Sequence, residues 1–135
     1  MKITGGCHCG QITYEADIDE DKIGICHCTD CQVLSGSAFR TVVFTIGDCF
    51  NLLTGKLKIY TKIAESGAER IQTFCPNCDS PIYSTSTSDI DRQYSIRLGT
   101  VNQRDGMVPK FQIWCRSSQS WLNDLGHIKK IAKQE

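Results

Sequence analysis

The stretch RIQTFCPNCDSPIYSTS, Arg70 to Ser86, sets two cysteines between two short segments that have the composition of β-strands. The flanking segments, residues 70–74 and 81–86, contain many β-branched and aromatic side chains, which suit a pleated, half-buried surface. Between them, Pro76 and Asn77 favour a tight turn. The stretch therefore predicts a hairpin whose turn presents a pair of thiols, and a two-residue gap lets such a pair bind one metal ion.

Similar segments recur along the chain and predict a protein made mainly of β-strands. They are short, rich in β-branched and aromatic residues, and separated by turn residues, as in a sandwich or a partly open barrel. The further segments are residues 11–16, 39–46, 56–61, 94–98 and 111–115. Helical signal is confined to Thr29–Gly36, where Thr29 is expected to cap one or two turns and Gly36 to end them.

Composition predicts one globular domain. The 135 residues are 40% hydrophobic and 22% charged, and fifteen basic residues balance fifteen acidic ones. We expect one domain over residues 1–135, with the fold at about 1–125 and a basic tail at 126–135. The balanced charge predicts neither nucleic acid nor membrane as a partner. Without a long apolar run or a signal peptide, the expected location is the cytoplasm, where thiols stay reduced.

Nine cysteines are unusual in such a chain, and their odd number excludes complete internal disulfide pairing. Seven fall into three tight groups: Cys7 and Cys9; Cys26, Cys28 and Cys31; Cys75 and Cys78. In a reducing compartment this grouping is typical of metal ligands. Each group is expected on a loop at a strand end, the first in a Gly-flanked turn before the first strand. Cys49 and Cys115 stand alone and are expected to pack as small apolar residues.

The seven grouped cysteines divide most simply into four and three, because a structural zinc site takes four ligands. A quartet can combine two pairs, or one pair with two members of the triplet. We favour the two pairs, since this choice leaves the triplet whole and ties the first turn to a distant hairpin. The quartet is then Cys7, Cys9, Cys75 and Cys78.

The triplet of Cys26, Cys28 and Cys31 has one ligand position to spare, which is the arrangement of a catalytic zinc. The spare position can take water, hydroxide or a thiol, and a thiol on zinc loses its proton at neutral pH. Two alternatives stay open, namely an iron–sulfur cluster and a second structural site. The candidates for a fourth ligand are His27, Asp30 and His8. Of these, His27 alternates with its flanking cysteines and is expected to point away.

Four motifs together resemble the glutathione-dependent formaldehyde-activating enzyme (Gfa) family, which includes centromere protein V. They are GGCHCG at 5–10, CHCTDCQVLSGSAF at 26–39, FCPNCDSPIY at 74–83 and PKFQIWCRSSQSWL at 109–122. The first three follow the order and spacing of the family, the fourth is similar to its C-terminal signature, and the resemblance covers nearly the whole chain.

The resemblance implies a β-tent, in which two antiparallel sheets carry zinc-knuckle loops at their edges. It implies two zinc ions per chain, a structural one and a catalytic one. The structural zinc would lie on Cys7, Cys9, Cys75 and Cys78, and the catalytic zinc on Cys26, Cys28 and Cys31. The implied activity is that of a carbon–sulfur lyase, which adds formaldehyde to the thiol of glutathione and gives S-hydroxymethylglutathione. The implied partner is a small-molecule thiol such as glutathione.

Two positions depart from the family. Asp79 stands where the family usually has Gly, so either it tolerates the backbone of the knuckle or the knuckle differs slightly. Gln112 stands where the family often has His, which bears on the substrate. A rival interpretation is a non-catalytic, zinc-stabilised protein-interaction module; chromatin binding, as a third, is disfavoured by the zero net charge.

The remaining candidates are arginines and aromatic residues. The three arginines could neutralise the carboxylates of a peptide thiol but are expected mainly as solvated surface charges; they are Arg40, Arg97 and Arg116. The three aromatic residues are expected in the core rather than as walls of a pocket; they are Phe111, Trp114 and Trp121.

Overall fold

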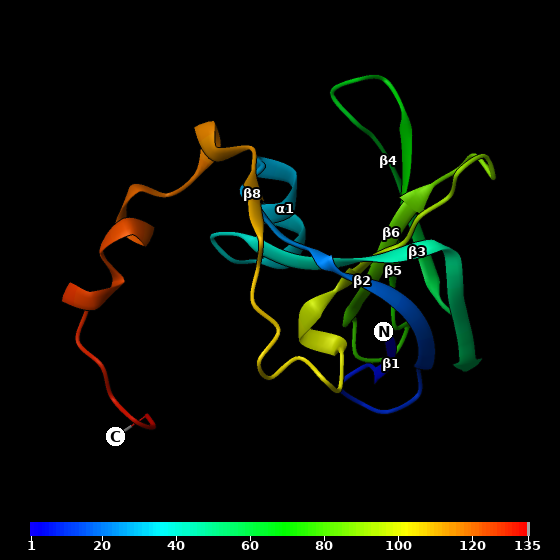
Figure 1. Cartoon of the computed structure of the whole chain (residues 1–135), viewed down its shortest axis with the longest axis horizontal. Coiled ribbons are helices and arrows are strands. Elements are labelled where there is room, and N and C mark those ends of the chain that lie inside the picture. The colour runs from blue at the N-terminus through cyan, green and yellow to red at the C-terminus, as the bar shows by residue number, and fades with distance from the viewer. Residues whose placement is uncertain (135) are drawn as a thin grey trace.

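A computed structural model describes residues 1–134 and shows a mainly β protein, as predicted (Figure 1). The strands are β1 (Lys2–Gly6), β2 (Thr13–Cys26), β3 (Arg40–Thr54), β4 (Lys58–Ile63), β5 (Glu69–Phe74), β6 (Pro81–Ser86), β7 (Ser95–Arg97) and β8 (Phe111–Ile113). The helices are α1 (Thr29–Ser35) and the 3₁₀ turns η1 (Leu98–Thr100), η2 (Cys115–Ser117) and η3 (Ser120–His127). None of these helices is long and apolar enough to cross a membrane.

The strands form one network in the order β1-β2-β3-β7-β6-β5-β4, with β8 added beside β2. The long strands β2 and β3 divide it into two sections, because their pairing shifts register between Ala16 and Ile23. In the small section, β1 and residues 50–54 of β3 flank the start of β2. In the large section, the end of β2 pairs with the start of β3, which continues through β7 to β4. The pairing is antiparallel apart from β8, which runs parallel to β2.

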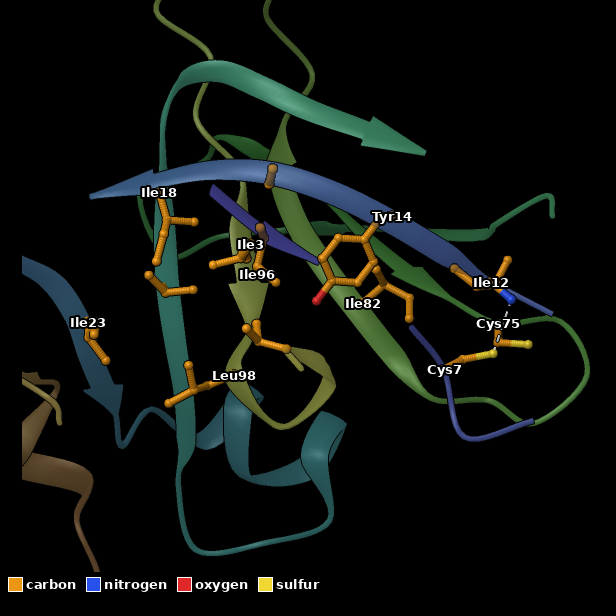
Figure 2. Packing of buried hydrophobic residues seen from close by; sticks show 13 residues of the cluster. Ile3, Cys7, Ile12, Tyr14, Ile18, Ile23, Cys75, Ile82, Ile96 and Leu98 are labelled. Atoms are coloured by element: carbon orange, nitrogen blue, oxygen red, sulfur yellow. Dashed lines mark hydrogen bonds between the residues drawn. The ribbon is translucent and has the colours of Figure 1, made fainter. Parts of the chain in front are cut away.

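The hydrophobic core lies between the two sections. Phe50 of the small section stacks on Tyr14, with ring centroids 5.1 Å apart, and meets the edge of Tyr83 of the large section at 4.7 Å. Figure 2 shows that isoleucines fill the space around the Tyr14 ring. Burial of such side chains stabilises the fold by about 1.5–3 kcal/mol each. The core therefore holds the sections face to face, and Cys7 and Cys75 lie at its edge.

The strand before the first cysteine pair was not predicted. Its sequence, KITGG, has the glycines of a turn, yet residues 2–6 pair fully with β2. At Gly5 a side chain would collide with the Tyr14 ring, because a Cβ there would lie 2.3 Å from that ring. Glycine is thus required in β1 so that Tyr14 can cover the strand. The first cysteine pair consequently lies between two strands, and its expected place before the first strand is wrong.

The predicted helix is present as α1, but its first cap differs. Cys28, not Thr29, is the N-cap: it is extended, with ψ 153°, and its Sγ accepts a hydrogen bond from the Cys31 amide at 3.2 Å. Gly36 ends the helix with φ +67°, as predicted, since glycine adopts this left-handed conformation without strain. A cysteine of the triplet therefore also starts the helix that carries the next one.

Candidate metal centres

The four-cysteine site brings together Cys7, Cys9, Cys75 and Cys78. Their sulfur atoms all lie within 4.8 Å of one another. Sγ of Cys9 lies 3.5 Å from Sγ of Cys7 and 3.7 Å from Sγ of Cys75. Four thiolates about 2.3 Å from a tetrahedral zinc ion would be about 3.8 Å apart, whereas a disulfide requires about 2.05 Å. All nine cysteines are free, and the four sulfurs fit a metal ion of this size.

This site joins the two sections of the sheet. Cys7 and Cys9 follow β1 in the small section, and the other pair forms the turn between β5 and β6 in the large section. Cys75 is fully buried, and the sulfurs of Cys7 and Cys75 face each other at the edge of the core in Figure 2. A metal ion held here would cross-link the sections much as a disulfide would.

Hydrogen-bond donors surround the sulfurs of the four-cysteine site. The Ile12 amide donates to Cys7 Sγ at 3.2 Å, and the Ser80 hydroxyl lies 3.2 Å from Cys78 Sγ. The Ser80 contact is the main cause that lowers the pKa of Cys78 to about 5. Donors directed at sulfur favour the thiolate, which is the form that binds metal.

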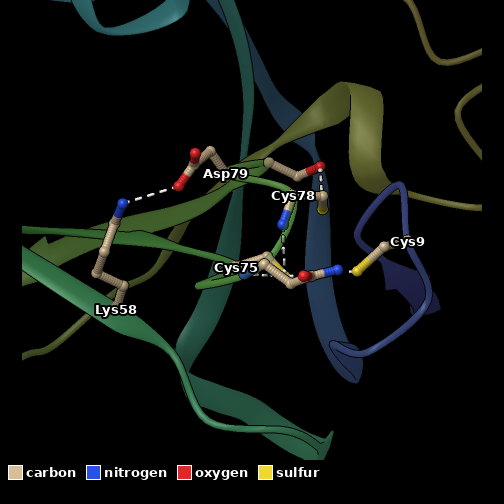
Figure 3. Close-up of polar contacts among 7 residues, drawn as sticks. Cys9, Lys58, Cys75, Cys78 and Asp79 are labelled. Atoms are coloured by element: carbon tan, nitrogen blue, oxygen red, sulfur yellow. Dashed lines mark hydrogen bonds and ion pairs between the residues drawn. The ribbon is translucent and has the colours of Figure 1, made fainter.

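Asp79 adopts the backbone conformation that the family assigns to glycine. Its φ is +61°, and its amide donates to the Cys75 carbonyl at 3.0 Å, closing the knuckle. Aspartate is among the residues that tolerate this region best. Figure 3 shows its carboxylate turned away from the sulfurs toward Lys58, whose Nζ lies 2.8 Å from Oδ1. The expectation that Asp79 tolerates this backbone is confirmed.

The three-cysteine site arises from one continuous stretch. Cys26 ends β2, Cys28 caps α1 and Cys31 lies in the first turn of that helix, and their sulfurs lie within 4.8 Å of one another. The neighbouring Cys31 side chain is the main cause that lowers the pKa of Cys26, and the Cys26 side chain is the main cause that raises the pKa of Cys31. Three sulfurs at this spacing can hold one face of a tetrahedral metal ion.

No histidine or carboxylate joins this group within residues 1–134. The ring of His27 turns toward β8, where its Nε2 lies 2.7 Å from Gln112 Oε1. Asp30 pairs with Lys62, with Oδ2 and Nζ 2.7 Å apart. The His8 amide bonds to Ser80 beside the four-cysteine site. The side chains of His27 and Asp30 are thus engaged elsewhere, His8 lies beside the other cluster, and His27 points away as expected.

Gln112 and Gln32 hold the three-cysteine loop against β8. Gln112 receives the buried His27 ring, and the Gln32 amide donates to the carbonyls of His27 and Ser117 at 2.9 and 3.0 Å. The backbone of His27 also donates to the Ile113 carbonyl. The residue at the family's histidine position therefore positions the loop between two cysteines of the triplet.

A cavity of about 350 Å³ opens beside the three-cysteine site. It is lined by Cys28, Thr29, Asp30, Lys62, Ala64, Glu65, Trp114, Arg116 and Ser117. The Arg116 guanidinium lies over the Trp114 ring, 4.9 Å from its centroid, and reaches Glu65 at 3.3 Å. The volume is within the range of small-molecule sites. A larger concavity of about 500 Å³ lies at the small section, near Cys49, without a cysteine cluster.

Several expectations about single residues are wrong. Trp114 and Trp121 are exposed, because the chain leaves the sheet after the three residues of β8 and Trp114 takes φ +56°. Cys49 and Cys115 are exposed as well. Phe111 is half-buried against Gly24, where a side chain would overlap its ring.

Two of the three arginines also differ from expectation. Arg40 and Arg97 are 5% and 8% exposed and are therefore not solvated surface charges. Arg116 is exposed, as expected. Sequence alone gives no signal for this difference, because each arginine sits in or beside a short apolar segment. Only the strand order shows that Arg40 and Arg97 lie inside the large section and that Arg116 does not.

The fold and these clusters define a small β-protein with one four-thiol and one three-thiol site. Residues 2–117 match the glutathione-dependent formaldehyde-activating enzyme family, and the chain belongs to this family. An uncharacterized lyase of Schizosaccharomyces pombe is 34% identical over 86 residues, which cover 62% of this chain and 58% of that protein. The chain thus matches little more than half of that relative's length.

A solved structure shares the fold. The crystal structure of a Rhodobacter sphaeroides protein superposes with a TM-score of 0.61 and covers 81% of this chain and 98% of the other. Its sequence identity is 18%, so the likeness concerns the fold alone.

Proposed function

We propose that the chain is a zinc-dependent carbon–sulfur lyase that uses Cys26, Cys28 and Cys31 as the ligands of its catalytic metal. The observation that carries this proposal is a three-sulfur face without a fourth protein ligand in residues 1–134, beside a cavity that Cys28 lines. Membership of the family supports the reaction, and the S. pombe relative is itself named a lyase.

Zinc at this site would supply Lewis acidity, under which a thiol in the fourth position loses its proton at neutral pH. In the proposed reaction the sulfur of glutathione attacks the carbonyl carbon of formaldehyde and forms the new carbon–sulfur bond. The π-electron pair of the carbonyl moves to oxygen, which takes up the proton released by the thiol. The product is S-hydroxymethylglutathione, and the reverse reaction is the lyase reaction.

Residues of the cavity are suited to a thiol that carries carboxylates. Arg116 is held over Trp114 and is exposed, and Lys62 lies across the cavity beside Asp30. Both cations have acidic partners that a substrate carboxylate would replace. The three sulfurs would hold the metal ion that takes up the reacting sulfur, and these two cations would align the rest of the molecule.

The second part of the proposal concerns the four-cysteine site. We assign it a structural zinc, held by Cys7, Cys9, Cys75 and Cys78, since its four sulfurs lie within 4.8 Å of one another and come from both sections. Two zinc ions per chain are then expected. The free thiols suit a reducing compartment such as the cytoplasm, and the balanced charge suits a small-molecule partner better than nucleic acid.

Metal analysis combined with X-ray absorption at the zinc edge tests both parts. The proposal predicts two zinc ions per chain and a gain of sulfur ligation when glutathione is added. The Cys28→Ser variant is the matched control, because it should retain one zinc with four sulfur ligands that glutathione does not change. A single zinc in the unaltered protein, or two four-sulfur sites indifferent to thiols, would instead favour a non-catalytic interaction module.

A further inference from the structure

Two buried arginines in the large section lack an acidic partner. Arg40 starts β3 and Arg97 ends β7, and neither forms an ion pair within residues 1–134. Nη2 of Arg40 and Nε of Arg97 are buried without a hydrogen-bond partner. A guanidinium stays protonated at neutral pH, and burying an unpaired charge is costly. A negative group nearby must therefore offset these charges.

Strand pairing places the three-cysteine site beside Arg40. Cys26 and Arg40 are directly opposite in the antiparallel pair of β2 and β3, so their side chains lie on the same face, with Cβ atoms about 5 Å apart. Arg97 lies opposite Val42, two residues along β3 from Arg40, and therefore shares that face. The thiolates are thus the negative groups next to the buried arginines.

Neutral groups hold Arg97 in place without cancelling its charge. Its Nη2 donates to Gln72 Oε1 at 2.6 Å, and its Nη1 lies 3.4 Å from the carbonyl and hydroxyl oxygens of Ser95. Burial, followed by the charge of Arg40, lowers the pKa of Arg97 to about 9. The fold therefore keeps the positive charges of Arg40 and Arg97 close together, on the strands next to the cysteine cluster.

The buried arginines do not line the cavity beside Cys28, whereas Lys62 and Arg116 do. They are consequently not placed to receive the carboxylates of a substrate. Their charge acts on the metal site itself. A divalent ion with three thiolates carries one net negative charge, and two guanidinium groups more than offset it. One further negative charge, brought by the fourth ligand, would bring the summed charge of the metal ion, its ligands and these two arginines to zero.

We propose that Arg40, backed by Arg97, is a positioning residue that makes an anionic fourth ligand preferred over a neutral one at the three-cysteine site. The inference rests on the proposed function in one respect, because it requires a metal ion with an open position there. It adds a reason for that site to take up a thiolate and assigns the reason to residues outside the ligand set.

The preference can be measured on protein loaded with Co²⁺, whose visible absorption reports the ligand set of each site. Two small probes are titrated: 2-mercaptoethanol, which binds as an anion and has no carboxylate, and imidazole, which is neutral. The change Arg40→Met should weaken the binding of 2-mercaptoethanol about tenfold or more and leave that of imidazole unchanged or tighter. Arg97→Met should also weaken 2-mercaptoethanol relative to imidazole, but by a smaller factor. Arg40→Lys should retain part of the preference for 2-mercaptoethanol.

The control Arg116→Met should leave both small probes unaffected and weaken glutathione alone, because Arg116 lines the cavity. If Arg40→Met does not fold, as circular dichroism would show, Arg97→Met and Arg40→Lys decide the question by the same ratio. An unchanged ratio of the two affinities in the folded variants overturns the role of Arg40 while the open site stands. Absence of any response to 2-mercaptoethanol in the unaltered protein overturns the open site as well.

Discussion

The two cysteine clusters differ in what they join. The four-cysteine site takes its ligands from loops of both sections, at the edge of the core, and Cys75 is fully buried. The three-cysteine site takes its ligands from one stretch, where β2 passes into α1, and Cys28 borders a cavity. A metal ion at the first site would hold the fold together. A metal ion at the second would be held by a fold that is already complete, and would face small molecules.

The polar groups around the sulfurs also differ between the two sites. The four-cysteine site is surrounded by short-range donors, such as the Ile12 amide and the Ser80 hydroxyl. The three-cysteine site has the unpaired charges of Arg40 and Arg97 on the adjacent strands. Short hydrogen bonds stabilise a fixed set of thiolates, whereas buried positive charge also attracts one more anion. The comparison thus distinguishes a site that keeps a fixed set of four ligands from a site whose fourth ligand can be exchanged.

The largest effect is expected when the four-cysteine site is broken. Cys75→Ser should remove its metal ion and lower the melting temperature by about 10 °C or more, since the cross-link between the sections is lost. Scanning calorimetry and zinc analysis would measure this. The exposed Cys115 provides the matched control, and Cys115→Ser should change neither quantity. An unaltered melting temperature in Cys75→Ser would remove the structural half of the comparison.

Breaking the three-cysteine site should instead affect the reaction strongly and the thermal stability only slightly. Cys28→Ser should lower the rate of hemithioacetal formation from glutathione and formaldehyde roughly 100-fold or more, while the melting temperature shifts by only about 3 °C. The small thermal effect is expected because the serine hydroxyl can still accept the hydrogen bond from the Cys31 amide. A large loss of stability without loss of the reaction would reverse the roles of the two clusters.

Sequence reasoning predicted the strands that alternate regularly and missed those that do not. β6 lies at residues 81–86, as predicted, because its alternating side chains and its turn agree. β1 was missed because its glycines serve the close approach of Tyr14, which is a tertiary requirement. The bend of β2 was not predicted either, because residues 17–22 are mostly charged and do not alternate like a strand. Where a strand bends between two sections depends on the packing of both sections.

At the candidate sites, the spacing of residues within one turn predicted the cysteine groups. The burial of single residues that depends on the pairing of distant strands could not be predicted. The cysteine groups follow from spacing, because each group lies within one turn. The burial of Arg40 and Arg97 depends on the order of β2, β3 and β7, which no single segment encodes. The exposure of Trp114 depends on where β8 ends. Sequence reasoning grouped the two distant cysteine pairs as the structure does, but it misjudged the single residues whose burial depends on distant strands.

A smaller effect should separate positioning from ligation at the three-cysteine site. Gln112→Ala leaves the buried Nε2 of His27 without its partner, which should cost about 1–3 kcal/mol of unfolding free energy and loosen the loop between Cys26 and Cys28. Urea unfolding measures the cost, and a titration with glutathione measures the loosening. Gln112→His, which restores the usual family residue, should retain more affinity than Gln112→Ala. Equal affinity in both variants would show that the contact with His27 does not position the loop.

The hydrogen bond from Ser80 gives a prediction about pH at the four-cysteine site. This bond is the largest of several contacts that lower the pKa of Cys78 to about 5, so protons compete with the metal ion for Cys78 mainly in acid. Ser80→Ala should raise that pKa, and the structural zinc should then leave at a higher pH, by about half a unit to one unit. A metallochromic dye would follow the release in a pH titration. Zinc release from the three-cysteine site should not move, and a common shift of both sites would contradict a local effect.

The smallest effect is expected at Asp79, where the knuckle departs from the family. Asp79→Gly relieves the left-handed backbone but loses the exposed ion pair with Lys58 and makes the unfolded chain more flexible, so the terms nearly cancel. The unfolding free energy should change by no more than about 0.5 kcal/mol. Asp79→Val should lower it by about 1–2 kcal/mol, because a β-branched side chain resists positive φ. Urea unfolding of both variants, with zinc bound, compares them directly. If valine were tolerated as well as glycine, the turn would not need φ +61°, and the closed geometry of the four-cysteine site would rest on the metal ion alone.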